Sequence, residues 1–402
     1  MSRPRPDVIV VGAGPAGSAT AILLAEQGLQ AVVLERGGPA RPKICGEYLS
    51  PEAGRVLDRL GVLKTVESAG AVALSGMRIT APDGTTLVGR YGAVGRFRPY
   101  REHAIGVSRA TLDGALLERL RGLPVDLREG VRVSDVVVER GCVVGVETVD
   151  GRRSTRTIRA PIVVAADGRA STVAQRLGCR HPHRLMRMAL VTYVSGLADC
   201  RDFGEIYVDP PDYGILNPLA PGRINVSLVV PLADAARWSG RLEDFFVARI
   251  RQLPHLGRRL AEARREAPLQ AMGPLAYRVT APRQHGVLLV GDAAGFYDPF
   301  TGEGVFTALR SAELAAEAAP ALVRGGDIAA AAMAAHARAR HAAFAGKERL
   351  THALQVLIRR RPLANAAARV LARRPGLLDV VLGVIGDFVP PRALLSARTF
   401  RS

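Results

Sequence analysis

Two glycine-rich segments have the residue types and spacing that bind phosphates and flat rings. Residues 12–17 read Gly-Ala-Gly-Pro-Ala-Gly and lie between an apolar run and a stretch of small residues. In a strand–turn–helix unit, Gly12 permits the tight turn, Gly14 lets the backbone approach a pyrophosphate, and Gly17 lets the helix pack on the strand. Glu35 ends the next apolar run, where an acidic side chain can bind an adenosine ribose. This pattern predicts dinucleotide binding, and an ordinary glycine-rich turn is the alternative.

The second segment, residues 287–304, begins with an apolar run that ends in Gly291 and Asp292. An aspartate at a strand end can accept a hydrogen bond from a ribityl hydroxyl. Gly302 and Gly304 allow close approach to a flat ring, and a helix beginning near Gly304 would direct its positive end at that ring. The two segments lie far apart in the chain, so they indicate one long cofactor, and a flavin dinucleotide has that shape. The alternative is a simple glycine loop or a calcium-like loop.

Four further side chains could take part in the chemistry. Asp167 follows a buried strand and precedes a glycine, and Arg109 begins a helix where it could bind a phosphate. Cys45 could donate a proton or shape a pocket, and Lys43 nearby would favour its thiolate form. The alternative is a small buried residue that supports a turn. Glu303 could be an acid in the site or a charge favoured by a helix N-terminus.

These residues require a strand and helix framework, which the periodicity of the chain predicts. A strand at 7–11, a helix at 16–27 and a strand at 31–34 form the first unit. A second helix follows at 51–60, and a hairpin turn is expected at 82–84. Further expected elements are a helix at 109–121, a four-stranded meander at 125–128, 131–139, 143–149 and 155–160, a buried strand at 162–166, a helix at 242–253, a helix at 304–324 and a helical region at 327–402.

Composition places the chain among globular proteins and gives little evidence on its partners. Of 402 residues, 48% are hydrophobic and 23% are charged, and no window approaches the ~20 apolar residues of a membrane span. The net charge is +18, yet no nucleic-acid motif accompanies it, so we expect no nucleic-acid partner. The cysteines and histidines lack metal-ligand spacing, so no metal site is predicted. We expect a cytoplasmic protein, with peripheral membrane contact through the basic, apolar C-terminal region left open and the oligomeric state unknown.

The motifs together resemble the FAD-dependent aromatic hydroxylase superfamily, also called group A flavoprotein monooxygenases. The resemblance rests on residues 12–17, Glu35-Arg36, Asp167-Gly168 and Gly291-Asp292. Within the superfamily, Lys-Ile-Cys-Gly-Glu at 43–47 and Pro-Phe-Thr-Gly-Glu-Gly at 299–304 are most similar to the geranylgeranyl reductase branch. The similarity covers about residues 7–320. It is specific to the superfamily and less specific to a reaction.

The resemblance implies a fold and a set of cofactor contacts. The fold would be α/β, with a Rossmann-like FAD-binding domain (1–71, 101–183 and 281–326) interleaved with an antiparallel-sheet substrate domain (72–100 and 184–280), plus C-terminal helices (327–402). NADPH or NADH would be the reductant, and Cys45 would lie near the flavin on the substrate side. The residues implied to contact FAD are Gly12, Gly14, Ala16, Gly17, Glu35, Arg36, Cys45, Arg109, Val133, Asp167, Gly291, Asp292, Pro299, Gly302 and Gly304.

The reaction stays open at this level. The first hypothesis is reduction or oxidation of a carbon–carbon double bond in an apolar isoprenoid or polyketide of secondary metabolism. The second is NAD(P)H- and O2-dependent hydroxylation of an aromatic or polyketide substrate, although the chain departs from the hydroxylases in having Gly-Glu-Gly at 302–304. Flavin halogenases share that style but need a Trp-x-Trp-x-Ile-Pro segment and a catalytic lysine, whereas this chain has a single tryptophan, Trp238. No residue favours a third hypothesis, a non-catalytic FAD-binding module or a basic scaffold.

Overall fold

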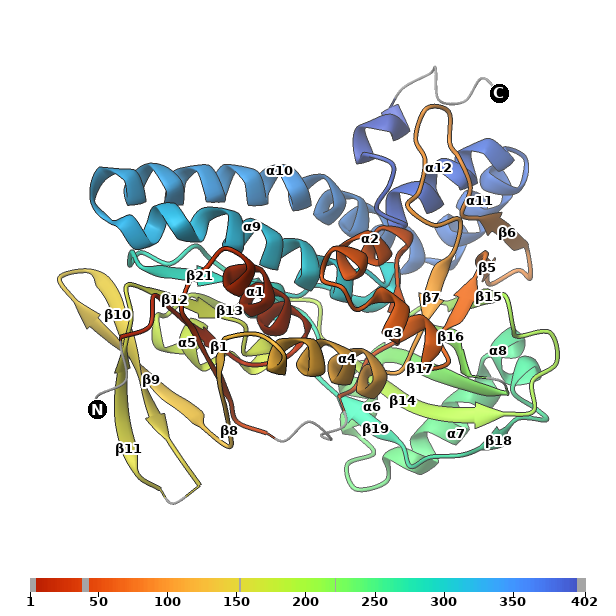
Figure 1. Ribbon diagram of the computed structural model, residues 1–402. Helices are drawn as coiled ribbons and strands as arrows, with labels where there is room; N and C mark the ends of the chain where they lie inside the picture. Colours follow the sequence, from red (N-terminus) through yellow and green to blue (C-terminus); the bar gives the residue numbers. More distant parts are fainter. Residues whose placement is uncertain (1–4, 38–42, 152, 221, 396–402) are drawn as a thin grey trace.

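A parallel five-stranded sheet forms the centre of the first layer (Figure 1). The computed structural model describes residues 5–37, 43–151, 153–220 and 222–395. The central strands are buried on both faces, as is usual for parallel sheets. Parallel pairing brings the residues that follow three of these strands, at 12, 166 and 290, to one edge. The strand order is β21 (Val287–Leu289), β12 (Ile162–Ala165), β1 (Val8–Val11), β2 (Ala31–Glu35) and β8 (Asp126–Glu129).

Helices cover one face of this sheet. The helix α1 is rich in small residues and buried along most of its length, because α4 and α9 pack against it. Ser108 accepts a hydrogen bond from the Thr111 amide at the start of α4, which stabilises that helix end. The helices on this side are α1 (Pro15–Glu26), α2 (Pro51–Arg59), α3 (Leu63–Ser68), α4 (Arg109–Arg121) and α9 (Gly304–Arg324).

An antiparallel meander of three strands covers the other face. Val143 and Val146 share a buried apolar cluster there with Ile9 and Val32 of the parallel sheet. The prediction of a four-stranded meander is wrong in one strand, because β8 pairs in parallel with β2. Val125 and Leu127 pack against the core on the helix-covered face, which explains this placement. The meander strands are β9 (Arg132–Glu139), β10 (Cys142–Val149) and β11 (Thr155–Arg159), and nearby lie α5 (Thr172–Arg176), β13 (Arg180–Pro182) and β20 (Tyr277–Val279).

A second, mainly antiparallel sheet has eight strands from two distant parts of the chain. The expected hairpin joins β5 to β6, with Thr80 opposite Thr86. Helices α6 (Leu232–Ala236), α7 (Leu242–Gln252) and α8 (Pro254–Arg259) pack against one face. The strand order is β18 (Arg264–Arg265), β14 (Arg187–Ser195), β17 (Arg223–Pro231), β16 (Asp212–Ala220), β15 (Phe203–Asp209), β5 (Gly76–Thr80) and β6 (Thr86–Arg90), and β19 (Gln270–Met272) pairs with β14.

A small sheet lies between these layers, and helices complete the chain. The small sheet contains β3 (Tyr48–Leu49), β7 (Ala104–Gly106) and β4 (Val72–Leu74). The C-terminal helices are α10 (Gly326–Ile358), α11 (Arg361–Ala372) and α12 (Pro375–Ile385), and each of the last two has a proline in its first turn. The helix α10 packs along α9, while α12 packs against β6 (Figure 1). In the described part of the chain, no helix has the length and apolarity needed to cross a membrane.

Candidate cofactor and substrate site

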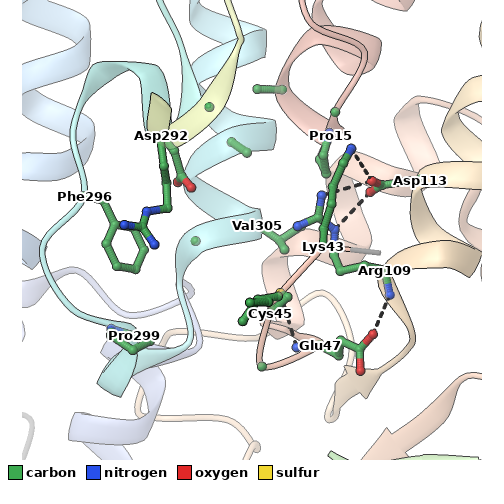
Figure 2. A pocket seen from close by; sticks show the side chains of 18 of the residues that line it. Pro15, Lys43, Cys45, Glu47, Arg109, Asp113, Asp292, Phe296, Pro299 and Val305 are labelled. Carbon is green, nitrogen blue, oxygen red and sulfur yellow. Dashed lines mark hydrogen bonds and ion pairs between the residues drawn. The ribbon is translucent and has the colours of Figure 1, made fainter. Parts of the chain in front are cut away.

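One cavity of about 580 Å³ joins the edge of the parallel sheet to the face of the eight-stranded sheet. Gly17, Gly291 and Glu303 are the three predicted site residues that do not line it. The structure brings the other predicted residues together around this cavity, and Figure 2 shows Cys45, Arg109, Asp292 and Pro299 among them. The predicted residues that line it are Gly12, Gly14, Ala16, Glu35, Arg36, Cys45, Arg109, Val133, Asp167, Asp292, Pro299, Gly302 and Gly304.

The first glycine segment has the geometry of a phosphate-binding turn. Gly12 has a φ of +99°, which disfavours any other residue. A Cβ atom on Gly17 would lie 1.8 Å from the Gly12 carbonyl oxygen, so Gly17 is required for close packing of helix on turn, as predicted. A Cβ atom on Gly14 would meet only the Lys43 Nζ atom, at 3.8 Å. The backbone at Gly14 therefore borders open cavity space at the N-terminus of α1, which favours anions.

Glu35 holds this turn through two backbone hydrogen bonds. Its Oε2 accepts the Ala13 amide at 2.7 Å, and its Oε1 accepts the Gly37 amide at 2.8 Å. Arg36 is exposed at the rim of the cavity. Gly291 packs instead against α1, since a Cβ atom there would lie 3.0 Å from the Ala16 Cβ. Contact of Glu35 with a ribose stays a prediction.

Two buried aspartates present acceptor oxygens to the cavity. Asp167 Oδ2 accepts the Thr172 amide at 2.7 Å, while its Oδ1 is buried without a partner among the described residues. Asp292 points into the cavity (Figure 2). Burial raises the pKa of both carboxyls, and the Arg109 and Arg169 cations oppose this effect at Asp292. The open backbone at Gly14 and the unpaired oxygen of Asp167 fit a ligand with phosphates and hydroxyls, as FAD has.

Arg109 is fixed by a carboxylate on its own helix. Its Nε and Nη2 atoms each donate to Asp113 at 3.0 Å, and the Lys43 Nζ lies 2.8 Å from the same carboxylate (Figure 2). Burial lowers the pKa of Arg109, but the charges of Asp113 and Cys45 and the hydrogen bonds to both side chains together outweigh it, so that pKa is raised. The charge of Lys43 is thus neutralised by Asp113, while the positive charge of Arg109 lies nearer to Cys45.

The loop that carries Cys45 is held by the second sheet, which the sequence analysis did not predict. Asn225 Nδ2 donates to the Cys45 carbonyl at 2.9 Å, and Asn217 Nδ2 donates to the Gly46 carbonyl at 2.7 Å. Glu47 has a φ of +56°, rare for a non-glycine residue, and its carboxylate accepts the Arg109 amide at 2.9 Å. These bonds fix Cys45 where the two layers meet.

The environment of Cys45 favours its protonated thiol. Burial raises the pKa of this thiol above its usual value, and the Arg109 cation offsets that effect only in part. The expectation that Lys43 favours a thiolate is therefore wrong, because desolvation dominates and Lys43 is paired with Asp113. A protonated thiol suits the role of proton donor better than that of nucleophile.

Alkylation by iodoacetamide should report this protonation directly. Because the reactive thiolate fraction grows as pH approaches the raised pKa, the Cys45 rate constant should rise about tenfold per pH unit from pH 7 to 9 without a plateau. Peptide-level mass spectrometry separates Cys45 from Cys142, a half-buried cysteine that serves as an internal standard outside the cavity. A rate that levels off below pH 8 at Cys45 would contradict the raised pKa.

Glu303 does not line the cavity and lies beside a buried lysine. Its Oε1 lies 3.5 Å from Lys347 Nζ, and Lys347 also pairs with Asp387 beyond α12. Burial raises the pKa of Glu303, while the Lys347 cation lowers it. The geometry favours a structural charge at the start of α9 over an acid that touches substrate.

The second half of the cavity is apolar. The eight-stranded sheet contributes its wall, and α12 contributes Leu382 and Ile385. The sequence analysis also missed Arg169, two residues after the predicted Asp167, and the Tyr48 and Tyr91 side chains. Of these three residues, only Arg169 lies next to a recognised motif, Asp167-Gly168, that could have indicated it. The cavity-lining residues on the sheet are Met77, Ile79, Ala189, Val191, Ile206, Ile215, Asn217, Ser227, Val229 and Met272.

Comparison with known proteins agrees with this geometry. A family model described as FAD binding domain matches residues 5–346. "Conditioned medium factor receptor 1" of Dictyostelium discoideum is 30% identical over 77% of this chain, and the match spans 62% of that relative. "Digeranylgeranylglycerophospholipid reductase 2" of Methanopyrus kandleri is 31% identical, covering 80% of this chain and 78% of the relative.

Among solved structures, "flavin-dependent brominase Bmp2" superposes with a TM-score of 0.83 at 21% identity, covering 98% of both chains. At that identity the likeness shows the shared fold alone. The family model and the relatives show family membership as well as the fold, because their matches cover most of the chain. The chain belongs to the family of FAD-dependent aromatic hydroxylases and their geranylgeranyl reductase-like relatives, and it is an FAD-dependent oxidoreductase.

Proposed function

We propose that this oxidoreductase reduces a carbon–carbon double bond of an apolar isoprenoid or polyketide, with NADPH or NADH as reductant. In the reverse direction, oxidation of the saturated bond would pass two electrons to the flavin. One observation carries the proposal: a protonated Cys45 thiol lies where the cofactor part of the cavity meets its apolar part. Double-bond reduction adds a hydride to one carbon and a proton to the other. Bound FAD would supply the two-electron chemistry, and Cys45 would hold the proton.

The chain's other residues would bind and orient the reactants. Gly14 and the start of α1 would bind the pyrophosphate, and Asp292 would accept a ribityl hydroxyl. Asn217 and Asn225 would position Cys45, while the apolar wall and α12 would exclude water from the reacting carbons. Contact with a membrane stays part of the proposal, supported by exposed Val356, Leu363 and Val370 near the arginines at 359–361.

Hydroxylation is the second candidate, because the family includes hydroxylases. It would need O2 and would leave an oxygen atom in the product. Halogenation has less support, since Lys43 is paired with Asp113 and Lys347 is buried beside Glu303. Neither lysine is placed as a free cation in the apolar part of the cavity.

Turnover with and without oxygen tests the proposal. FAD-loaded protein would be incubated anaerobically with NADPH and either geranylgeraniol or an anthraquinone, and products would be weighed by mass spectrometry. A gain of two hydrogens without O2 supports reduction, and Cys45→Ser should lower that rate about 100-fold or more, whereas Cys142→Ser should not. Substrate-stimulated O2 uptake with a gain of one oxygen would establish hydroxylation instead.

A further inference from the structure

Two tyrosines that line the cavity are joined through their hydroxyls. The Tyr48 and Tyr91 oxygens lie 2.5 Å apart, both side chains line the cavity, and their residues are only 6% and 1% exposed. Tyr48 comes from β3 and Tyr91 follows β6, so elements distant in sequence build the pair. Both tyrosines belong to an apolar cluster that includes Met77, Leu87 and Phe300, and the Glu303 carboxylate is close enough for its charge to help raise the pKa of Tyr48.

The pair lies beside the segment predicted to face the flavin ring. A Cβ atom on Gly302 would be 2.7 Å from Tyr48 Cδ1, so the tyrosine ring packs directly on that glycine. Gly302 has a φ of +68°, and both it and Tyr48 line the cavity. The hydroxyl pair is therefore a polar group between the segment that contains Gly302 and the apolar wall of the cavity.

The two hydroxyls carry two protons but make one hydrogen bond with each other. Each tyrosine hydroxyl has one O–H donor, so when one donates to the other, the second donor still needs an acceptor. Among the described residues, neither oxygen has another hydrogen-bond partner. Burial raises the pKa of both hydroxyls, which keeps them neutral and able to donate. A buried donor without a partner is costly unless a ligand supplies the acceptor.

We infer that the Tyr48–Tyr91 pair donates a hydrogen bond to a carbonyl oxygen of the substrate. The inference rests on the proposed function in taking the apolar part of the cavity as the substrate site, and it names the class as an apolar, conjugated carbonyl compound such as an enone or quinone. A hydrogen bond to such a carbonyl draws electron density from the adjoining double bond. The pair thus selects substrates whose double bond is prepared for two-electron reduction.

Binding of two probes with one carbon skeleton tests the inference. FAD-loaded, oxidised protein without reductant would be titrated with 2,3-dimethyl-1,4-naphthoquinone and with 2,3-dimethylnaphthalene. Loss of one hydrogen bond corresponds to about a tenfold change in Kd, so the native protein should prefer the quinone about tenfold. In the double variant Tyr48→Phe/Tyr91→Phe the preference should fall to about one, with the hydrocarbon Kd unchanged within about twofold.

Matched controls separate this effect from loss of packing. Tyr207→Phe removes a half-buried hydroxyl that donates to Glu205 outside the cavity, and it should leave the preference intact. The single variants Tyr48→Phe and Tyr91→Phe serve if the double variant does not fold, and at least one should lower the preference. The infrared carbonyl band of the bound quinone should shift to lower frequency only where the preference is present.

Two outcomes would overturn the inference: a quinone preference that survives in the double variant, or a native protein that binds neither probe. Failure of the proposed function has a different signature. In that case the protein either retains no flavin absorbance or reduces no double bond of any substrate tested. Neither result depends on the ratio of the Kd values for the quinone and the hydrocarbon.

Discussion

Gly14→Ala should fold normally and fail to retain FAD. The new Cβ would meet only Lys43 Nζ at 3.8 Å, and Gly14 has an ordinary φ of −74°, so the change costs the polypeptide little. It would, however, place a methyl group where the backbone must approach a pyrophosphate. We expect FAD affinity to fall about 100-fold, which equals about 2.7 kcal/mol. Flavin absorbance after gel filtration measures retention, and thermal unfolding of the FAD-free protein measures the fold.

Substitutions of two other glycines serve as controls for Gly14→Ala. Gly114→Ala in α4 also meets open space but lies outside the cavity, so it should keep both fold and flavin. Gly17→Ala should not fold, because its Cβ would overlap the Gly12 carbonyl at 1.8 Å. If Gly14→Ala retained FAD as tightly as Gly114→Ala, the pyrophosphate would have to bind elsewhere, and the assignment of this turn would fail.

Local signals in the sequence predicted the framework because the framework is local. Apolar runs and glycine turns predicted β1, α1 and β2. The strand β8 was misassigned to the meander, since alternation alone cannot say which neighbour a strand joins. Here the packing of Val125 and Leu127 decided the pairing.

The parts of the site that escaped prediction depend on contacts between distant residues. Asn225 reaches the Cys45 carbonyl across 180 positions, and no pattern near either residue indicates that bond. The pKa of Cys45 shows the same limit: the sequence displays a neighbouring lysine, but burial and the partner of that lysine exist only in the fold. Tyr91 likewise becomes a site residue only when the small sheet brings Tyr48 to it.

Lys347→Met should destabilise the protein by about 3–5 kcal/mol at neutral pH. Lys347 is 8% exposed and is the cation between Glu303 at the start of α9 and Asp387 beyond α12. Its Nζ also lies 5.1 Å from the centre of the Phe306 ring. Methionine preserves the length of the side chain but leaves two carboxylates without their counter-ion in an apolar setting. Chemical denaturation at equilibrium measures the loss.

The pH dependence of that loss distinguishes charge from packing. Burial already raises the pKa of Glu303, and removing the lysine raises it further, so the folded variant favours the protonated acid. A group with a raised folded pKa stabilises the protein at low pH and loses that contribution as pH rises through the folded value. The destabilisation should therefore be smaller at pH 5 than at pH 8. Arg349→Met, at an exposed site on the same helix, should cost less than about 1 kcal/mol at both pH values. A loss that is equal at both pH values would assign Lys347 a packing role, because an uncompensated carboxylate must respond to protons.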